Sequence, residues 1–167
     1  MGNFLGIDAS TQSMTGLVIN TDTATIVAEV SVNFDEHYAE RYGVSNGVID
    51  LGDGQMHSAP LMWAEALEQL CRQLSDSGVH LGDMDAVCGS GQQHGTVYLN
   101  DQAATALSGL SARADLAGQI EGIFSRATAP IWMDRSTGEQ CRQIEAGVGG
   151  REALLQLTGN TAFERFS

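Results

Sequence analysis

Apolar and polar residues alternate along the first part of the chain in the way that is typical of β-strands. Residues 4–7, 14–20 and 25–32 are predicted to form three strands, and the third has apolar side chains at every second position. The connections are short, and residues 20–22 favour a turn. We therefore expect an antiparallel meander at the start of the fold.

One longer helix is predicted over residues 58–77. Ser58 is the expected N-cap, Pro60 suits the first turn, and Gly78 is expected to end the helix. Its apolar side chains recur at helical spacing, which predicts one buried stripe. The stripe consists of Trp63, Leu67, Leu70 and Leu74.

Shorter elements are predicted beyond this helix. Residues 84–90 are expected to form a buried strand, and residues 96–99 and 131–133 two further short strands. Residues 33–55 are polar and dotted with glycine, which predicts an irregular segment, whereas residues 102–126 give no clear pattern. Mixed strands and helices of this kind predict an α/β layer architecture.

Two helices are predicted near the C-terminus. Residues 136–139 have the form of a capping box, and residues 149–150, both glycine, are expected to break the helix that it opens. Residues 152–157 are expected to form a final short helix. The chain ends at Ser167 in a stretch with aromatic residues and a charge pair, so we expect a fragment of a longer protein. The apolar side of the first of these helices carries Cys141, Ile144 and Val148.

The charge of the chain excludes two classes of function. It has 21 acidic and 8 basic residues, a net charge of −13, and every base is arginine. Nucleic-acid binding needs a dense basic face, and a Walker-type P-loop needs a lysine, so neither is expected. Any phosphate would have to be held by backbone N–H groups, hydroxyl groups and a metal ion.

The cysteines and the lack of targeting signals predict a cytoplasmic protein. Cys71, Cys88 and Cys141 are far apart and odd in number, which favours reduced thiols. No run approaches the ~18 apolar residues that a membrane-spanning helix needs. The N-terminus also lacks a basic segment followed by an apolar one, so no signal peptide is expected.

The stretch "GIDASTQS" places an acid and several hydroxyl groups at the end of the first predicted strand. Asp8 is well placed to hold a hydrated Mg²⁺, which takes one or two carboxylates and keeps several waters. The groups beyond it could face phosphate oxygens; they are Ser10, Thr11, Gln12 and Ser13. The alternative is a simple turn in which Asp8 caps its own backbone.

Three later stretches carry groups suited to a polyol. "SGQQHG" presents Gln93 and His94 where a strand ends, and amides and imidazoles both donate and accept hydrogen bonds. "PIWMDRST" offers Trp132 for a sugar face and Asp134 for hydroxyl protons, and "FERF" offers Arg165. The alternatives are a polar loop with a bonded histidine, a core tryptophan with a helix-capping aspartate, and a surface arginine paired with an acid.

Together these stretches resemble one family. "FLGIDASTQSMTGLVIN", "SGQQHG", "PIWMDRSTGEQCRQIEAGVGG" and "LTGNTAFERF" are similar to the N-terminal part of FGGY carbohydrate kinases, closest to the xylulose kinase branch. The resemblance implies an α/β, ribonuclease-H-like (actin-type ATPase) fold with a mixed sheet and flanking helices. Residues 1–167 would then be an incomplete N-terminal sugar-binding domain of a two-domain kinase, with the ATP-binding domain absent.

The resemblance also implies roles for individual residues. Asp8 and the loop after it match the motif that contacts ATP phosphates and Mg²⁺, whereas His94 and Arg165 match sugar-binding residues. The sequence departs from the family where Asp8-Ala9-Ser10-Thr11 replaces Asp-x-Gly-Thr and where no base follows near Thr15. The catalytic aspartate of the family is expected beyond residue 167.

The expected function is therefore ATP-dependent phosphorylation of a xylulose-like ketose. The expected partner is a small sugar, with ATP and Mg²⁺ as cofactors, a possible homodimer, and no nucleic acid or membrane. Two other readings stay open: a catalytically silent sugar-binding or assembly module, and a chaperone-like or actin-like nucleotide switch of the same fold.

Overall fold

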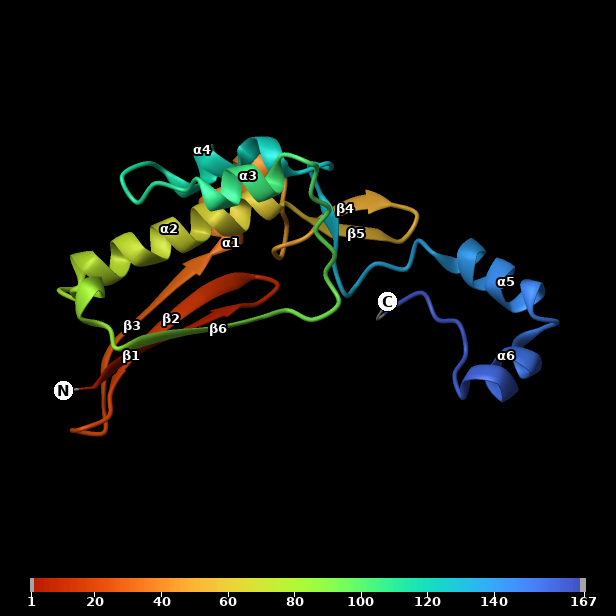
Figure 1. Cartoon of the computed structure of the whole chain (residues 1–167), viewed down its shortest axis with the longest axis horizontal. Helices are drawn as coiled ribbons and strands as arrows, with labels where there is room; N and C mark the ends of the chain where they lie inside the picture. Colours follow the sequence, from red (N-terminus) through yellow and green to blue (C-terminus); the bar gives the residue numbers. More distant parts are fainter. Residues whose placement is uncertain (1, 166–167) are drawn as a thin grey trace.

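A four-stranded mixed sheet forms the base of the molecule in the computed structural model, which describes residues 2–165 (Figure 1). The strands are β1 (Asn3–Ala9), β2 (Ser13–Asn20), β3 (Thr25–Asn33) and β6 (Ala86–Gly91). Their order is β3-β2-β1-β6, with β1, β2 and β3 antiparallel and β6 parallel to β1. The predicted meander is therefore confirmed, and Phe166, the last residue of "FERF", lies outside the described residues.

One face of this sheet is covered by α2 (Pro60–Asp76), with α1 (Phe34–Tyr42) beside it (Figure 1). Leu70 and Leu74, from the predicted stripe, are fully buried, and Trp63 and Leu67 pack against the same core. Gly16 lets the helix approach, since a Cβ there would lie 3.0 Å from Leu70 Cδ2. Burial of each leucine contributes about 1.5–3 kcal/mol, so this contact fixes the helix on the sheet.

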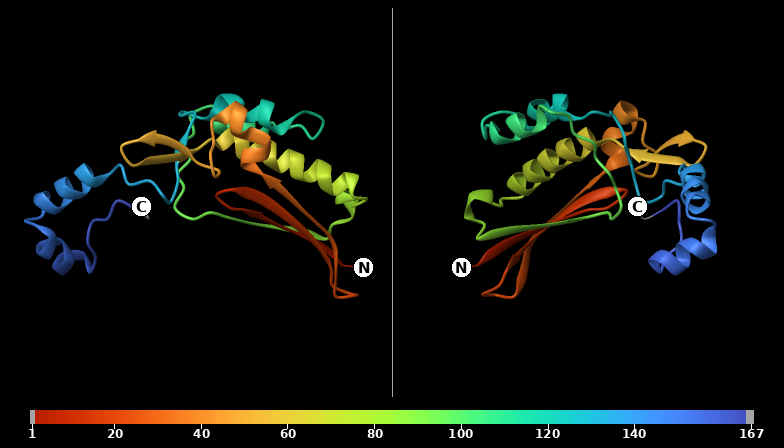
Figure 2. Two further views of the ribbon diagram at one scale, coloured as in Figure 1. Left: turned by 180° about the vertical axis from the view of Figure 1, so that it is seen from behind. Right: turned by 45° about the vertical axis from the view of Figure 1, so that its right-hand side comes forward.

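A second, smaller sheet lies beside the first. It contains β4 (Ile49–Gly52), β5 (Gln55–Ser58) and β7 (Ala129–Pro130), in the order β4-β5-β7. Two short helices, α3 (Ala103–Ser108) and α4 (Leu116–Ile120), lie over α2, on the side away from the large sheet (Figure 2). The 3₁₀ turns are Leu81–Asp83 and Glu121–Ile123.

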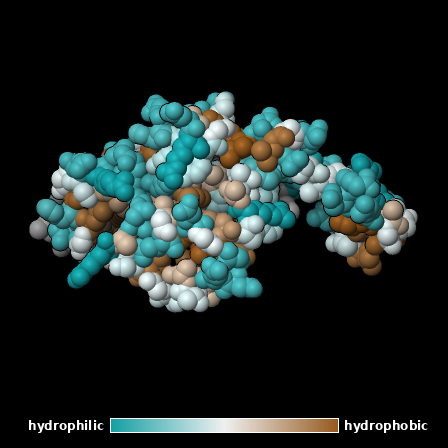
Figure 3. Space-filling model, turned by 90° about the horizontal axis from the view of Figure 1, so that it is seen from above, coloured by the Kyte–Doolittle hydropathy of each residue, from teal (hydrophilic) through white to brown (hydrophobic). Residues whose placement is uncertain are grey.

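The last two helices, α5 (Gly138–Gly147) and α6 (Arg151–Thr158), project away from both sheets (Figures 1 and 2). The predicted apolar side of α5 is not covered: no described residue of α5 is buried, and Ile144 is 53% exposed. Figure 3 shows apolar side chains on the surface at this end of the molecule. The glycine break at residues 149–150 and the final helix are confirmed.

Two predictions for residues 33–58 are wrong. Residues 33–55 are not irregular, because Asn33 caps α1 by accepting from the Glu36 N–H and Gly43 ends it in the left-handed conformation. Ser58 does not cap α2; it belongs to β5, and the N-cap is Ala59.

The predicted strand at residues 84–90 exists as β6 but is exposed, because α2 covers β2 and β3 and leaves this edge strand open. Residues 96–99 form no strand, although Leu99 makes an isolated bridge with Phe124. Residues 131–133 form a turn after β7 rather than a strand.

The capping box at residues 136–139 does not form. Thr137 is the N-cap of α5 but makes no side-chain capping bond, and Glu139 binds Arg142 within the helix instead. No helix among residues 2–165 has the length and apolar character to cross a bilayer.

Candidate functional site

Asp8 lies near the end of β1, on the face of the sheet opposite to α2. Its backbone pairs with Thr15 on β2 and Ser90 on β6, and the Ser90 hydroxyl donates to Asp8 Oδ1 at 2.5 Å. The carboxylate is exposed and lines an open groove of about 350 Å³ together with both neighbours. Asp8 therefore faces a surface groove, and its described hydrogen bond leads to β6 and not to the turn that follows.

The turn after Asp8 is held by its own hydroxyl groups. Ser10 donates its N–H to the carbonyl of Ser13 at 2.9 Å, and its hydroxyl lies 3.0 Å from the same carbonyl oxygen. The carbonyl of Gln12 accepts the N–H of Phe34, which begins α1. The turn-capping role weighed for Asp8 thus belongs to Ser10 in the described contacts.

Trp132 connects this turn to the other end of the chain. Its indole N–H donates to Thr11 Oγ1 at 3.0 Å. The guanidinium carbon of Arg165 lies 5.9 Å from the centre of the Trp132 ring, within the range of a cation–π contact. A cavity of about 410 Å³ beside them is lined by Ser10, Thr11, Gln12, Asn46, Val48, Trp132 and Met133.

Gln93 and His94 lie in an exposed turn after β6. His94 has a positive φ of 59°, a conformation that costs energy for a residue other than glycine. Just after it, Thr96 donates its N–H to the carbonyl of Pro130 at 3.1 Å. The histidine turn therefore lies beside the strand that leads into Trp132.

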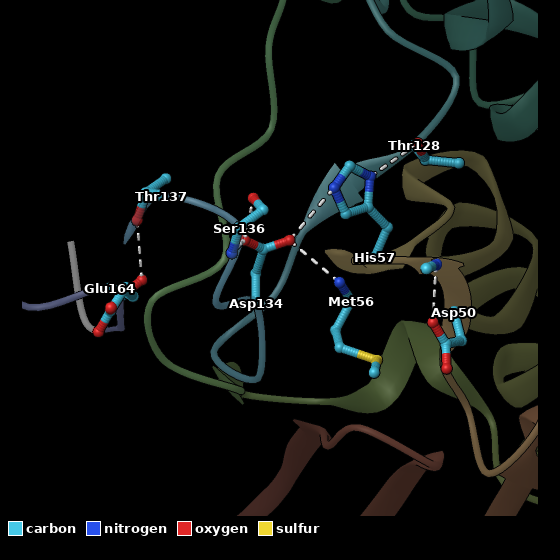
Figure 4. A network of polar contacts seen from close by, with 9 residues as sticks. Asp50, Met56, His57, Thr128, Asp134, Ser136, Thr137 and Glu164 are labelled. Carbon is cyan, nitrogen blue, oxygen red and sulfur yellow. Dashed lines mark hydrogen bonds and ion pairs between the residues drawn. The ribbon is translucent and has the colours of Figure 1, made fainter. Parts of the chain in front are cut away.

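Asp134 is the most buried charged group of the candidate site, with 7% of its surface exposed. Its Oδ1 accepts the N–H and the hydroxyl of Ser136 at 2.9 and 2.6 Å (Figure 4). Its Oδ2 accepts the Met56 N–H at 3.0 Å and lies 3.5 Å from His57 Nε2. Burial raises the pKa of Asp134, but the bonds from Ser136 and Met56 and the nearby His57 outweigh it and leave the pKa below its usual value.

His57 is a site residue that the sequence alone does not single out. It lies on β5, where it pairs with Pro130, and its Nδ1 lies 2.9 Å from Thr128 Oγ1 (Figure 4). Its partner Thr128 is 71 residues away and Asp134 is farther still, so no local pattern points to them.

The segment that carries Arg165 is attached to the same region. Thr137 Oγ1 donates to the carbonyl of Glu164 at 3.2 Å, and Arg165 follows directly (Figure 4). Residues 131–137 therefore contact the Asp8 loop through Trp132, β5 through Asp134, and the C-terminal segment through Thr137. The structure gathers Thr11, Asp134 and Arg165 around one segment, with the His94 turn beside it.

The donors present suit a hard, hydrated cation better than a fully protein-bound metal. The described residues contain no cluster of three or more His, Cys, Asp or Glu side chains that could hold a metal ion. The groove at Asp8 also presents the hydroxyl groups of Thr15 and Ser90. One carboxylate with hydroxyl neighbours fits Mg²⁺, which keeps most of its waters. Another cavity, about 550 Å³ between α1, α2 and α4, contains none of the sequence-predicted site residues.

No protein-family model matches the chain. Known proteins of similar sequence nevertheless cover nearly all of it. The chain is 40% identical to xylulose kinase 2 of Arabidopsis thaliana over 166 residues, which is 98% of this chain and 29% of that protein. It is 41% identical to the xylulose kinase of Mus musculus over 164 residues, again 98% of this chain and 29% of the relative.

The fold agrees with this relationship. The crystal structure of a xylulose kinase from Rhodospirillum rubrum matches 98% of this chain and 27% of that one, with a TM-score of 0.65 and 18% identity. Sugar kinases of this kind have the actin-like ATPase fold, which is the fold predicted here. The chain is therefore homologous to the xylulose kinases of the FGGY carbohydrate kinase family and spans about 29% of the length of such an enzyme.

Proposed function

We propose that this chain is part of the sugar-binding domain of a two-domain kinase that transfers phosphate from ATP to a ketose such as xylulose. The contact of Trp132 with both Thr11 and Arg165 supports this proposal most. It brings the loop expected to face phosphates next to the arginine expected to bind sugar. Phosphoryl transfer requires such closeness, because the attacking hydroxyl must lie in line with the phosphate.

On the phosphate side, Asp8 holds the metal and the loop after it faces the phosphates. Mg²⁺ bound there would neutralise charge on the transferred group. The backbone N–H groups of Thr11 and Gln12 make none of the described hydrogen bonds, so they can donate to an anion. Ser10 and Ser13 shape the loop through their mutual bonds and complete the proposed site.

On the sugar side, Gln93, His94 and Arg165 contact hydroxyl groups. Gln93 and His94 offer both donors and acceptors, and Arg165 offers a fixed fork of donors. Asp134 was also expected to contact the sugar, and this stays a prediction; its four protein contacts leave it little acceptor capacity. The base that removes the sugar proton is proposed to lie in the part of the kinase that this chain does not include.

The proposal can be tested with a chimeric kinase, in which this chain replaces the aligned segment of the mouse enzyme. Asp8→Asn should reduce turnover with D-xylulose strongly while sugar affinity measured without ATP stays the same, because Asp8 is proposed to contact the metal and not the sugar. Asp76→Asn, an exposed aspartate at the end of α2, is the matched control. Unchanged turnover of Asp8→Asn would contradict the metal role.

The same chimera separates the other two readings. Sugar binding without phosphate transfer would support a silent binding module, and nucleotide binding without any effect of sugar would support a nucleotide switch. A cytoplasmic location agrees with the free thiols of Cys71, Cys88 and Cys141. Homodimerisation stays a prediction.

A further inference from the structure

We propose that His57 is a positioning residue for the sugar side of the site, acting through Asp134 on the segment 131–137. This inference rests on the proposed function for its kinetic consequence, but its structural part does not depend on it. His57 touches neither Thr11 nor Arg165 in the described contacts. It acts on both through a connected set of polar and cation–π contacts, and Figure 4 shows the part of this set around Asp134.

The two ring nitrogens of His57 have different partners. Nδ1 lies 2.9 Å from Thr128 Oγ1, on the segment that enters β7, and Nε2 lies 3.5 Å from Asp134 Oδ2, on the segment that leaves it. The two contacts lie on different sides of the ring, since Nε2 faces the Asp134 carboxylate and Nδ1 shares a hydrogen bond with the Thr128 hydroxyl. One side chain on β5 therefore holds residues on both sides of β7.

The Asp134 carboxylate in turn shapes the segment after β7. It accepts from β5 through Met56 and from its own turn through Ser136, and the backbone adds bonds from Ile131 to Met56 and from Arg135 to Gly54. A buried carboxylate is stable only while its partners surround it. Loss of the His57 contact leaves Oδ2 with one described donor, and the turn gains freedom to shift.

That turn places the groups that the site needs. Trp132 lies within this turn, where it donates to the Thr11 hydroxyl and contacts the Arg165 guanidinium. Thr137 lies at the end of the turn and donates to the Glu164 carbonyl. A shift of the turn therefore moves Arg165 at two points of attachment. Displacements of about 1 Å in positioning groups can cost orders of magnitude in rate or affinity, so the effect on sugar binding should be measurable.

Two substitutions separate the two nitrogens of His57. In His57→Gln the side-chain amide replaces Nε2, which keeps the contact with Asp134 and loses that with Thr128. In His57→Asn the amide replaces Nδ1, which keeps Thr128 and loses Asp134. His80→Gln, at an exposed histidine after α2, is the control for loss of a histidine.

The first readout is the fluorescence of Trp132 in the full 167-residue chain. The chain has two tryptophans, so Trp63→Phe leaves Trp132 as the single tryptophan, whose emission is selected by excitation beyond the tyrosine absorption band. His57→Asn should shift its emission to longer wavelength and increase quenching by acrylamide, whereas His57→Gln should resemble His80→Gln. Ser136→Ala, which removes one donor to Oδ1, should give a smaller shift in the same direction, and it serves in place of His57→Asn if that variant does not fold.

The second readout is the kinetics of the chimeric kinase. His57→Asn should raise the KM for D-xylulose about fivefold or more, with little change in the KM for ATP, and His57→Gln should restore it. Equal behaviour of His57→Asn, His57→Gln and the control in Trp132 fluorescence would overturn the inference. If the chimera with His57 intact shows no xylulose-dependent turnover, the proposed function fails, and the fluorescence alone then decides whether His57 positions this segment.

Discussion

The indole N–H of Trp132 donates to the hydroxyl of Thr11 at 3.0 Å, across 121 residues of sequence. This bond joins the turn after β7 to the turn after β1, so the two should be energetically coupled. We expect Trp132→Phe and Thr11→Val each to lower the free energy of unfolding by about 1 kcal/mol, the usual net value of one hydrogen bond.

The double variant tests the coupling. Because both single substitutions break the same bond, we expect the double variant to be destabilised by less than the sum of the two. Urea unfolding of the four proteins measures this. Strict additivity would show that the bond contributes nothing to stability.

Gly47 allows the loop after Asp8 to pass close to the backbone. It adopts a positive φ of 73°, and a Cβ there would lie 2.0 Å from the carbonyl oxygen of Thr11. Gly47→Ala should therefore displace the Thr11 loop and destabilise the chain by more than about 2 kcal/mol. Circular dichroism during thermal unfolding measures the loss.

Gly43→Ala is the matched control for that substitution. Gly43 has almost the same φ, 70°, but no atom lies within 4 Å of the position that a Cβ would occupy there. Gly43→Ala should therefore cost only the left-handed penalty of about 1–2 kcal/mol. Equal losses at both glycines would show that the contact with Thr11 does not constrain the loop.

Asp134 should make the stability of the chain depend on acid pH. Its pKa is lower in the folded chain than its usual value, so its contribution is complete above the unfolded pKa of about 3.9 and is lost as the pH falls through the folded pKa. Asp134→Asn should cost about 2–3 kcal/mol at pH 7 and progressively less below pH ~4.

Urea unfolding of wild type and variant at pH 7 and pH 3 checks this. Glu139→Gln is the control, since the pKa of Glu139 is also lowered, by Arg142 and Gln143, but its side chain lies on the exposed surface of α5. A constant difference between wild type and Asp134→Asn at both pH values would argue against an ionised Asp134 in the network.

The two expected sugar contacts come from positions 71 residues apart, and they are expected to act on one ligand. In the chimeric kinase, His94→Ala and Arg165→Ala should each raise the KM for D-xylulose, with the Arg165 effect at least about tenfold, because a hydrogen bond to a charged group contributes about 1.5–3 kcal/mol. The KM for ATP should change much less. Arg151→Ala, at an exposed arginine of α6, controls for loss of charge.

The elements that could be predicted correctly are those that a local pattern of apolar residues defines. The meander of β1, β2 and β3 and the stripe of α2 follow from local alternation and helical spacing, and both are confirmed. α1 was missed because its residues are mostly polar, and only Phe34 and Tyr38 of that helix are buried. Its caps, Asn33 and Gly43, were the local signal that could have revealed it.

The site was only partly accessible from sequence. Asp8, Thr11 and Arg165 stand out because their neighbours form distinctive stretches, but their roles stay predictions. His57 could not be recognised, because its partners Thr128 and Asp134 reach it only through the pairing of β5 with β7. The exposure of β6 was also hidden, since an apolar run does not say whether another layer covers it.

The isolated chain is expected to lack activity by itself. The base and the ATP-binding domain are proposed to lie outside this chain, and a site that is open to solvent cannot exclude water. The 167-residue chain should therefore show no D-xylulose-dependent consumption of ATP in a coupled assay. Formation of sugar phosphate by the pure chain would overturn this division of roles.

The most direct test of the central claim is xylulose-dependent ATP consumption by the chimera of this chain with the mouse enzyme. If this chain supplies the sugar side and the phosphate loop of a ketose kinase, the chimera should consume ATP only when D-xylulose is present. Arg165→Ala should then raise the KM for D-xylulose. A folded chimera that consumes no ATP with D-xylulose or with any of a panel of ketoses and polyols would contradict the account.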